Sequence, residues 1–262
     1  MKTAARYKAV WELMTAVFAD RQPADNIINA YFRERRFIGS GDRRFIAEKI
    51  WHIIRRRRRL TFEAGSADPR KLLIAYLKDE DPAEIFAGGE YGLPPLNDDE
   101  RKLAAALRTE ERTYPPAVEC ECPDWLFAKI GDPLLLKALN EPAGADFRVC
   151  RGSREEVLRL LENEGFEAVP TPYSPLGIRL PTRINLNNCM AYQDGLIEVQ
   201  DEASQLAALM CGVRPEDRII DYCSGAGGKA LALAAQLKGQ GVIEAHDINP
   251  QRLEQLKPRL AR

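Results

Sequence analysis

The chain has few of the residues that build metal sites and no stretch that could span a membrane. It contains two histidines in 262 residues and carries a net charge of -1. No segment approaches the roughly 18 consecutive apolar residues that a transmembrane helix needs. The first residues lack an apolar run with a cleavage site, so a secretory signal is not supported. We therefore expect a cytoplasmic protein with no membrane partner.

The six cysteines are scattered along the chain, unlike those of a small secreted domain held by disulfides. Cys120 and Cys122 are separated by one residue, whereas the C-x-x-C pairs that bind zinc have two between them. The pattern predicts reduced thiols and no metal site.

The near-zero net charge conceals a strong asymmetry. Residues 1–60 contain 15 Lys and Arg against 6 Asp and Glu, whereas residues 61–124 contain 7 against 15. The basic segment ends in five consecutive arginines: Arg55, Arg56, Arg57, Arg58 and Arg59. The helix dipole favours cations at a helix C-terminus, but five in a row exceed that need. The run predicts contact with an RNA backbone, and the alternative is a solvated helix end.

The N-terminal part has the periodicity of an all-helical domain. Apolar residues at helical spacing predict helices over 6–19 and 23–36. A third helix is expected to begin with Asp42 as its N-cap and to end in the arginine run. Apolar clusters at 70–77 and 99–108 extend the helical pattern to about residue 112.

The middle of the chain, after a linker at Pro115-Pro116, has the pattern of a small α+β module. Ser153 and Glu156 have the spacing of a capping box, which predicts the start of a helix. Short strands are predicted before and after this helix, over 147–151, 166–169 and 177–180.

The last segment has the order strand, loop, helix, strand, helix, which is the opening of a doubly wound α/β sheet. The strands are expected over 218–222 and 241–246. Helices are expected over 203–211 and 229–237, and a further helix starts at Asn249-Pro250.

A loop of small residues, Ser224 to Gly228, follows the first of these strands, and Asp247 stands at the end of the second. Glycines let a backbone approach a ligand closely, and an acid at this position can accept hydrogen bonds from ribose hydroxyls. The arrangement predicts a nucleoside-containing cofactor. Gly225, Gly227 and Ala230 also satisfy G-x-G-x-x-A, so a dinucleotide is one alternative and an ordinary tight turn is another. A P-loop is excluded because Ala230 stands where Ser or Thr is required.

Three linked motifs are present here: V-Q-D-E-A-S at 199–204, D-Y-C-S-G-A-G-G-K at 221–229, and Asp247 followed by Arg252-Leu253. Together they resemble the RNA (cytosine-5)-methyltransferases of the Sun/RsmB type. That family has V-Q-D-E-A-S and D-x-C-A-A-P-G-G-K at these places, so Ser-Gly-Ala replaces Ala-Ala-Pro in this chain.

The resemblance continues upstream. Residues 123–126, the strand at Arg148 and the run 174–180 are similar to the RNA-binding module before the family's catalytic domain, although Cys150 replaces the usual Asn. Motifs at 21–25 and 41–44 resemble the NusB-like domain of the bacterial 16S rRNA enzymes. The resemblance implies a multidomain fold with three parts: an all-α NusB-like RNA-binding head at 1–114, a linker and small α+β RNA-binding module at 115–194, and the first part of an α/β Rossmann-like methyltransferase domain at 195–262.

Enzymes of this family transfer a methyl group from S-adenosylmethionine to C5 of a cytosine in ribosomal RNA during rRNA processing. The resemblance therefore implies ribosomal RNA as the partner and assigns the cofactor's ribose to Asp247. It assigns the remaining cofactor contacts to Cys223, Ser224, Gly225, Ala226, Gly227, Gly228, Lys229 and Arg252. The sequence does not indicate an oligomeric state.

The family's nucleophile is a cysteine in a D-x-P-C strand end, with a second cysteine in a later Pro-Cys pair. This chain contains no Pro-Cys pair, and Cys223 lies inside the cofactor loop, where a small packing residue is expected. No catalytic residue is therefore assigned, and we expect the chain alone to be inactive, as the N-terminal part of a longer enzyme or a shortened gene product. The alternative function is a non-catalytic RNA-binding or ribosome-assembly module.

Overall fold

The computed structural model describes residues 1–181 and 184–261. Contacts between residues divide the chain into two compact units, Met1–Glu141 and Pro142–Arg262, and each is described by itself below. Residues 115–141 belong to the first unit, so the predicted boundary at 114 falls inside it. The division into three domains stays a prediction.

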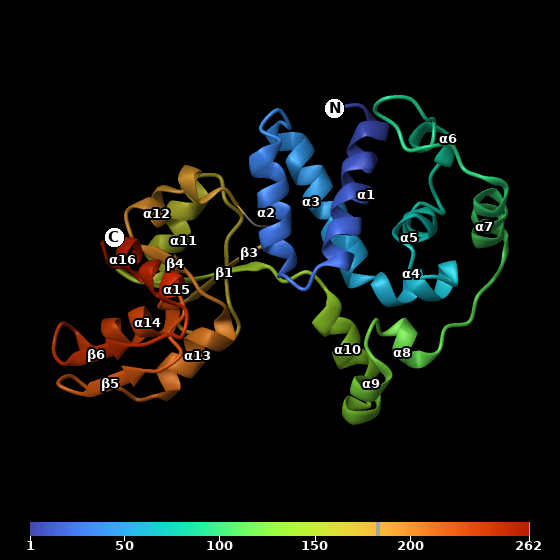
Figure 1. Cartoon of the computed structure of the whole chain (residues 1–262). Coiled ribbons are helices and arrows are strands. Elements are labelled where there is room, and N and C mark those ends of the chain that lie inside the picture. Colours follow the sequence, from blue (N-terminus) through green and yellow to red (C-terminus); the bar gives the residue numbers. More distant parts are fainter. Residues whose placement is uncertain (182–183, 262) are drawn as a thin grey trace. The chain divides into compact units, whose positions relative to one another are not determined.

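All regular elements of the first unit are helices, in agreement with its periodicity. They are α1 (Thr3–Ala19), α2 (Ala24–Glu34), α3 (Ser40–Arg55), α4 (Arg57–Ala64), α5 (Pro69–Tyr76), α6 (Pro82–Ile85), α7 (Asp98–Thr109), α8 (Pro116–Glu119), α9 (Asp124–Ile130) and α10 (Pro133–Asn140) (Figure 1). Four of these helices, α5, α6, α7 and α10, start after a residue whose side chain caps the first turn. Asp68 accepts hydrogen bonds from the first amides of α5, and Asn97 with Glu100 forms a capping box at α7. In the part of the chain that the structure describes, no helix is long and apolar enough to cross a membrane.

Helix α1 lies at the centre of the helical core. It packs against α2, α3, α5 and α6. Its buried face repeats every three to four residues through Tyr7, Val10, Leu13 and Met14, and Leu13 is 0% exposed. The facing side of α3 contributes buried isoleucines at 46, 50 and 53. Each fully buried side chain of this size stabilises the fold by roughly 1.5–3 kcal/mol.

One expectation for the third helix is wrong. Asp42 is not its N-cap, because α3 begins at Ser40 with Gly39 at the cap position. Instead the Asp42 carboxylate, in the first turn, accepts hydrogen bonds from the amino group of Met1 at 2.8 Å and from Arg6 Nε at 2.6 Å. The helix ends in the arginine run, as expected. Its last residue is Arg55, and the non-helical backbone of Arg56 separates it from α4.

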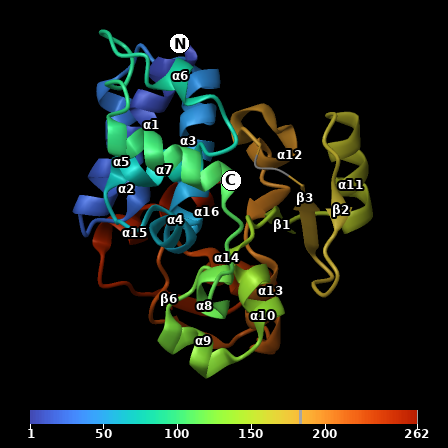
Figure 2. The ribbon, with the colours of Figure 1, turned by 90° about the vertical axis from the view of Figure 1, so that its right-hand side faces the viewer.

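The second unit contains a four-stranded antiparallel sheet and a separate pair of parallel strands. The strand order of the larger sheet is β2-β3-β1-β4, and the pair is β5-β6. Figure 2 shows α11 beside β2 and β3. The elements are β1 (Ala145–Val149), α11 (Arg154–Asn163), β2 (Val169–Pro170), β3 (Gly177–Leu180), a 3-10 helix (Leu186–Asn188), α12 (Met190–Gln193), β4 (Ile197–Val199), α13 (Glu202–Met210), β5 (Arg218–Asp221), α14 (Gly228–Leu237), β6 (Val242–Ala245), α15 (Pro250–Glu254) and α16 (Leu256–Leu260).

The predicted β-α-β-β order of the middle segment is confirmed. The capping box is present, since Ser153 Oγ accepts from the Glu156 amide at 3.2 Å and Glu156 accepts from the Ser153 amide at 2.8 Å. Strand β4, which pairs with β1 through Ile197 to Val199, was not predicted. A three-residue strand has too short a pattern to be recognised from alternation. The first residue of the V-Q-D-E-A-S motif therefore belongs to the four-stranded sheet.

Candidate functional site

The glycine-rich loop and Asp247 lie at the same end of the β5-β6 pair. The two strands are parallel, with Asp221 opposite Ala245, so the segments that follow them meet. The backbone joins them directly, because the His246 amide donates to the carbonyl of Asp221 and the Ser224 amide donates to the carbonyl of His246, each at 2.8 Å. This is the edge at which a parallel α/β sheet binds its ligand.

The Asp247 carboxylate is tied to the loop. Its Oδ1 accepts a hydrogen bond from the Asn249 amide at 2.8 Å, and its Oδ2 accepts from the Gly225 amide at 2.7 Å. These two bonds lower the pKa of Asp247 below its usual value, because both favour the charged form. Asp247 is therefore ionised at neutral pH, and each oxygen keeps a lone pair that can accept a further hydrogen bond.

The loop needs its glycines for conformation and for space. Gly225 and Gly227 have φ angles of +57° and +80°, in the left-handed region that side chains rarely adopt. A Cβ atom at Gly225 would lie 3.2 Å from the guanidinium of Arg252, and one at Gly227 would overlap Leu256. The guanidinium of Arg259 also donates to the carbonyl of Ala226. The α15–α16 segment thus packs directly on the loop.

Two polar side-chain atoms at the loop have no hydrogen-bond partner within the described ranges. These are Asp221 Oδ2 at the end of β5 and Ser224 Oγ, and both are buried. Because both atoms are closed to solvent, they are not available to a ligand while the loop keeps this conformation. Cys223 and Lys229, in contrast, are exposed, and the expected packing role of Cys223 is wrong.

A buried polar network, which was not predicted, connects the V-Q-D-E-A-S motif to the four-stranded sheet. Gln205 is 1% exposed, donates to the carbonyls of Gln200 and Phe147, and accepts from Ser174 Oγ at 2.7 Å. Glu202 accepts from the Ser174 amide at 2.8 Å. The run 174–180 and the V-Q-D-E-A-S segment are far apart in sequence. These bonds through Ser174 join them into one structural feature. Gln200 also donates to the carbonyl of Gly228, which links the network to the start of α14.

The arginine run lies at the junction of α3 and α4 and has partners of its own. Arg58 pairs with Asp124 at 2.6 Å, and Arg59 lies 3.5 Å from Glu121. Arg57 stacks over the ring of Phe18 at 4.2 Å. The first two contacts join α4 to the α8–α9 segment, and the third joins α4 to α1. Arg56 and Arg57 are exposed, whereas Arg55, Arg58 and Arg59 are half-buried. The five arginines therefore do not form one free surface, and their contact with RNA stays a prediction.

The fold and the loop together define a class of site. It is a strand–glycine turn–helix unit with an acid at the end of the next strand, and it suits a nucleoside-containing cofactor.

No family model matches the chain. The chain is 30% identical over 148 residues to ribosomal RNA small subunit methyltransferase B of Proteus mirabilis, covering 53% of this chain and 35% of that protein. It is 35% identical over 112 residues to the protein of the same name from Pseudomonas syringae, covering 42% and 24%. It is 34% identical over 112 residues to the mouse 28S rRNA (cytosine-C(5))-methyltransferase, covering 43% and 24%.

Two solved structures share the fold. The crystal structure of PH0851 matches 100% of this chain and 68% of its own, with a TM-score of 0.71 and 17% identity. That of a methyltransferase homolog protein from Pyrococcus horikoshii matches 56% and 51%, with a TM-score of 0.50 and 23% identity. The chain spans about a quarter to a third of the length of the curated relatives above. Over about half of its residues the chain is thus related to proteins named as rRNA methyltransferases, which confirms the family resemblance that its motifs indicated.

Proposed function

We propose that this chain is the RNA-binding and cofactor-loop part of an S-adenosylmethionine-dependent methyltransferase that modifies C5 of a cytosine in ribosomal RNA. One observation carries the proposal. The hydrogen bond of 2.7 Å between Asp247 and the Gly225 amide joins the acid after β6 to the glycine turn after β5. Supporting it are relatives whose names specify rRNA small subunit and cytosine-C5 methylation.

The residues at the loop fit such a cofactor. Asp247 is ionised and can accept hydrogen bonds from both ribose hydroxyls. Arg252 places a cation beside Gly225 that can face a carboxylate. When bound, S-adenosylmethionine supplies an electrophilic methyl group. The chain's own contribution is to hold and orient that cofactor.

The nucleophile is not assigned to this chain. Cytosine C5 attacks a methyl group only after a thiolate has added to C6, and the family's thiolates belong to Pro-Cys pairs. These 262 residues include no such pair. We propose that the chain by itself binds cofactor and RNA without transferring a methyl group.

The cofactor proposal is tested by calorimetric titration of the whole chain with S-adenosylmethionine. We expect binding, and we expect Asp247→Asn to weaken it by about tenfold, because the neutral side chain loses the charge-assisted hydrogen bonds to the ribose. Glu254→Gln is the matched control, because Glu254 is an exposed acid of α15 that pairs with Lys257. Circular dichroism of each variant verifies that the fold is retained. Equal affinity of the wild type and Asp247→Asn would contradict the assigned role of Asp247.

The same titration separates the alternatives. Binding of NAD without S-adenosylmethionine would indicate a dinucleotide site. Binding of neither cofactor, with RNA binding retained, would favour the non-catalytic RNA-binding or ribosome-assembly module.

Contact between the arginine run and RNA is tested with a variant that keeps the ion pairs of Arg58 and Arg59. Arg56→Gln with Arg57→Gln removes the two exposed guanidinium groups and leaves the contacts of Arg58 and Arg59 intact. We expect RNA affinity to fall and its salt dependence to become shallower by up to about two released counterions. An unchanged salt slope would show that RNA binds elsewhere.

A further inference from the structure

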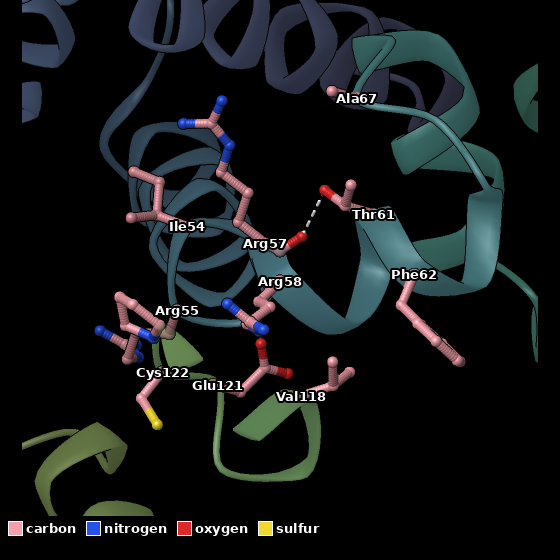
Figure 3. Close-up of a pocket in the computed structure, with 11 residues that line it drawn as sticks. Ile54, Arg55, Arg57, Arg58, Thr61, Phe62, Ala67, Val118, Glu121 and Cys122 are labelled. Atoms are coloured by element: carbon pink, nitrogen blue, oxygen red, sulfur yellow. Dashed lines mark hydrogen bonds between the residues drawn. The ribbon is translucent and has the colours of Figure 1, made fainter. Parts of the chain in front are cut away.

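A groove with a volume of about 600 Å³ lies in the helical unit, between the α3–α4 junction and the segment from α8 to the start of α9. Side chains of α3 and α4 face those of the α8–α9 segment across it (Figure 3). Its apolar lining includes Ile54, Phe62 and Val118, and its cationic lining is Arg55, Arg57 and Arg58. All of these residues belong to one compact unit.

The groove carries an excess of positive charge. Arg55 and Arg57 have no acidic partner in the described part of the chain, and Arg58 pairs with an aspartate whose side chain is 80% exposed. The carboxylate that lines the groove is that of Glu121. It accepts from the Arg59 amide at 3.0 Å and faces the Arg59 guanidinium, so its charge is offset. A ligand with negative groups therefore matches the groove.

The apolar part of the groove suits a flat ring. Phe62 is 43% exposed although it is aromatic. Its ring lies beside that of Tyr114, with the two ring centroids 5.8 Å apart, and is not part of the core. Bases of single-stranded RNA stack on such rings and on guanidinium planes, while their phosphates contact cations. A duplex keeps its bases inside and cannot offer one to a groove of this kind.

We propose that this groove binds an unpaired nucleotide of RNA. The base lies against Ile54, Phe62 and Val118, and the flanking phosphates contact Arg55 and Arg57. The inference rests on the proposed function for the identity of the ligand as RNA. It adds that the helical unit distinguishes single-stranded RNA from duplex.

A substitution that fills the groove without changing its charge tests the proposal. Ala67 lines the groove, is exposed and follows the end of α4, so Ala67→Trp adds a large side chain there. Ala87, an exposed alanine outside the groove, gives the matched control Ala87→Trp. Fluorescence anisotropy of the whole chain measures affinity for a short labelled oligouridine and for a duplex hairpin of equal charge.

We expect Ala67→Trp to weaken oligouridine binding by about tenfold, the effect of losing one stacked base, and to leave duplex affinity within about twofold. Ala87→Trp should change neither affinity. A second variant, Phe62→Leu, keeps apolar volume but removes the ring, and should weaken oligouridine binding by about threefold. This variant tests the proposal even if Ala67→Trp does not fold.

Three outcomes would overturn the inference. Equal losses for oligouridine and duplex in Ala67→Trp would show that the groove does not recognise unpaired bases, with the proposed RNA function left standing. Absence of RNA binding by the wild-type chain would overturn both proposals. Tight binding of polyglutamate, with no preference for oligouridine, would identify the groove as a site for acidic peptides.

Discussion

The helical core and the β5-β6 pair bury their apolar side chains to very different extents. In α1, Leu13 and Met14 are both 0% exposed, within a core that runs from α1 to α7. In and after β5, Ile220 is 66% exposed and Tyr222 is 77% exposed. The buried cluster beside β5 and β6 consists of Ala208, Ala232 and Leu233. Because apolar burial is the main stabilising contribution in folding, the helical core is expected to be the more stable of the two.

The difference shows how the cofactor loop is built. A parallel sheet normally has helices on both faces and several strands, and among the described residues β5 pairs with β6 alone. Few apolar contacts therefore hold the loop. Its shape depends on local hydrogen bonds, above all those from the Gly225 amide to Asp247 and from the Ser224 amide to His246. Geometry for ligand binding is thus present in a region with little core.

The largest expected effect is in the helical core. Leu13→Ala should lower the free energy of unfolding by about 3 kcal/mol, through lost burial and the cavity it leaves. Ile220→Ala, the same kind of truncation on an exposed side chain, should change it by less than about 0.5 kcal/mol. Tryptophan fluorescence during denaturation reports on the helical unit, which contains Trp11, Trp51 and Trp125. Hydrogen exchange of the β5 amides reports on Ile220→Ala. Similar losses of stability in Leu13→Ala and Ile220→Ala would contradict the difference in burial between the helical core and the β5-β6 pair.

A smaller effect is expected in the polar network of the second unit. Gln205→Leu should destabilise the four-stranded sheet by about 2 kcal/mol, because it removes the side-chain donor to the buried carbonyls of Gln200 and Phe147. Hydrogen exchange of the β1 amides measures this loss. Gln240→Leu, in an exposed turn, is the matched control. Unchanged protection of β1 would mean that the network contributes little.

The acid sensitivity of the same sheet should depend on Arg179. Its guanidinium donates to Asp146 at 2.7 and 2.8 Å, and this lowers the pKa of the buried Asp146 carboxyl. The folded pKa lies below the unfolded value of about 3.9, so the stabilisation is present above that value and is lost as the pH falls through the folded pKa. Arg179→Met should lower stability at neutral pH and make its loss in acid shallower. Hydrogen exchange of the β3 amides, corrected for its intrinsic pH dependence, measures the stability at neutral pH and its loss in acid. If the stability of the wild type and of Arg179→Met falls equally with pH, the ion pair does not cause the acid sensitivity.

The smallest effect is expected at the surface of the helical unit. Asp124→Asn removes the partner of Arg58, and the two groups lie only 2.6 Å apart. Because the Asp124 side chain is 80% exposed, solvent and salt screen the pair. We expect a loss of stability close to the limit of measurement that disappears at high salt. A loss as large as that of Gln205→Leu would show that this contact stabilises the α8–α9 segment far more than its exposure suggests.

Much of the second unit could be predicted from the sequence, because its signals are local. The capping box of Ser153 and Glu156 and the strand at 177–180 lie where their patterns indicate. Asp247 lies against the glycine turn, as its place after the second strand predicted. The exposure of Cys223 could not be predicted, since residue type alone does not say which way a loop turns a side chain.

The sequence by itself therefore determined the features that depend on neighbours along the chain: the capping box of α11, the glycine turn, the acid at a strand end and the family resemblance. Tertiary structure alone decided which distant residues meet. Arg58 and Arg59 bind partners 66 and 62 residues away. Part of the arginine run, which in the sequence suggests a free basic surface, therefore contacts other parts of the helical unit. Gln205 likewise satisfies groups 58 and 31 residues away. Such pairings leave no periodic signal, because they arise only when the folded core brings separate segments within hydrogen-bond distance.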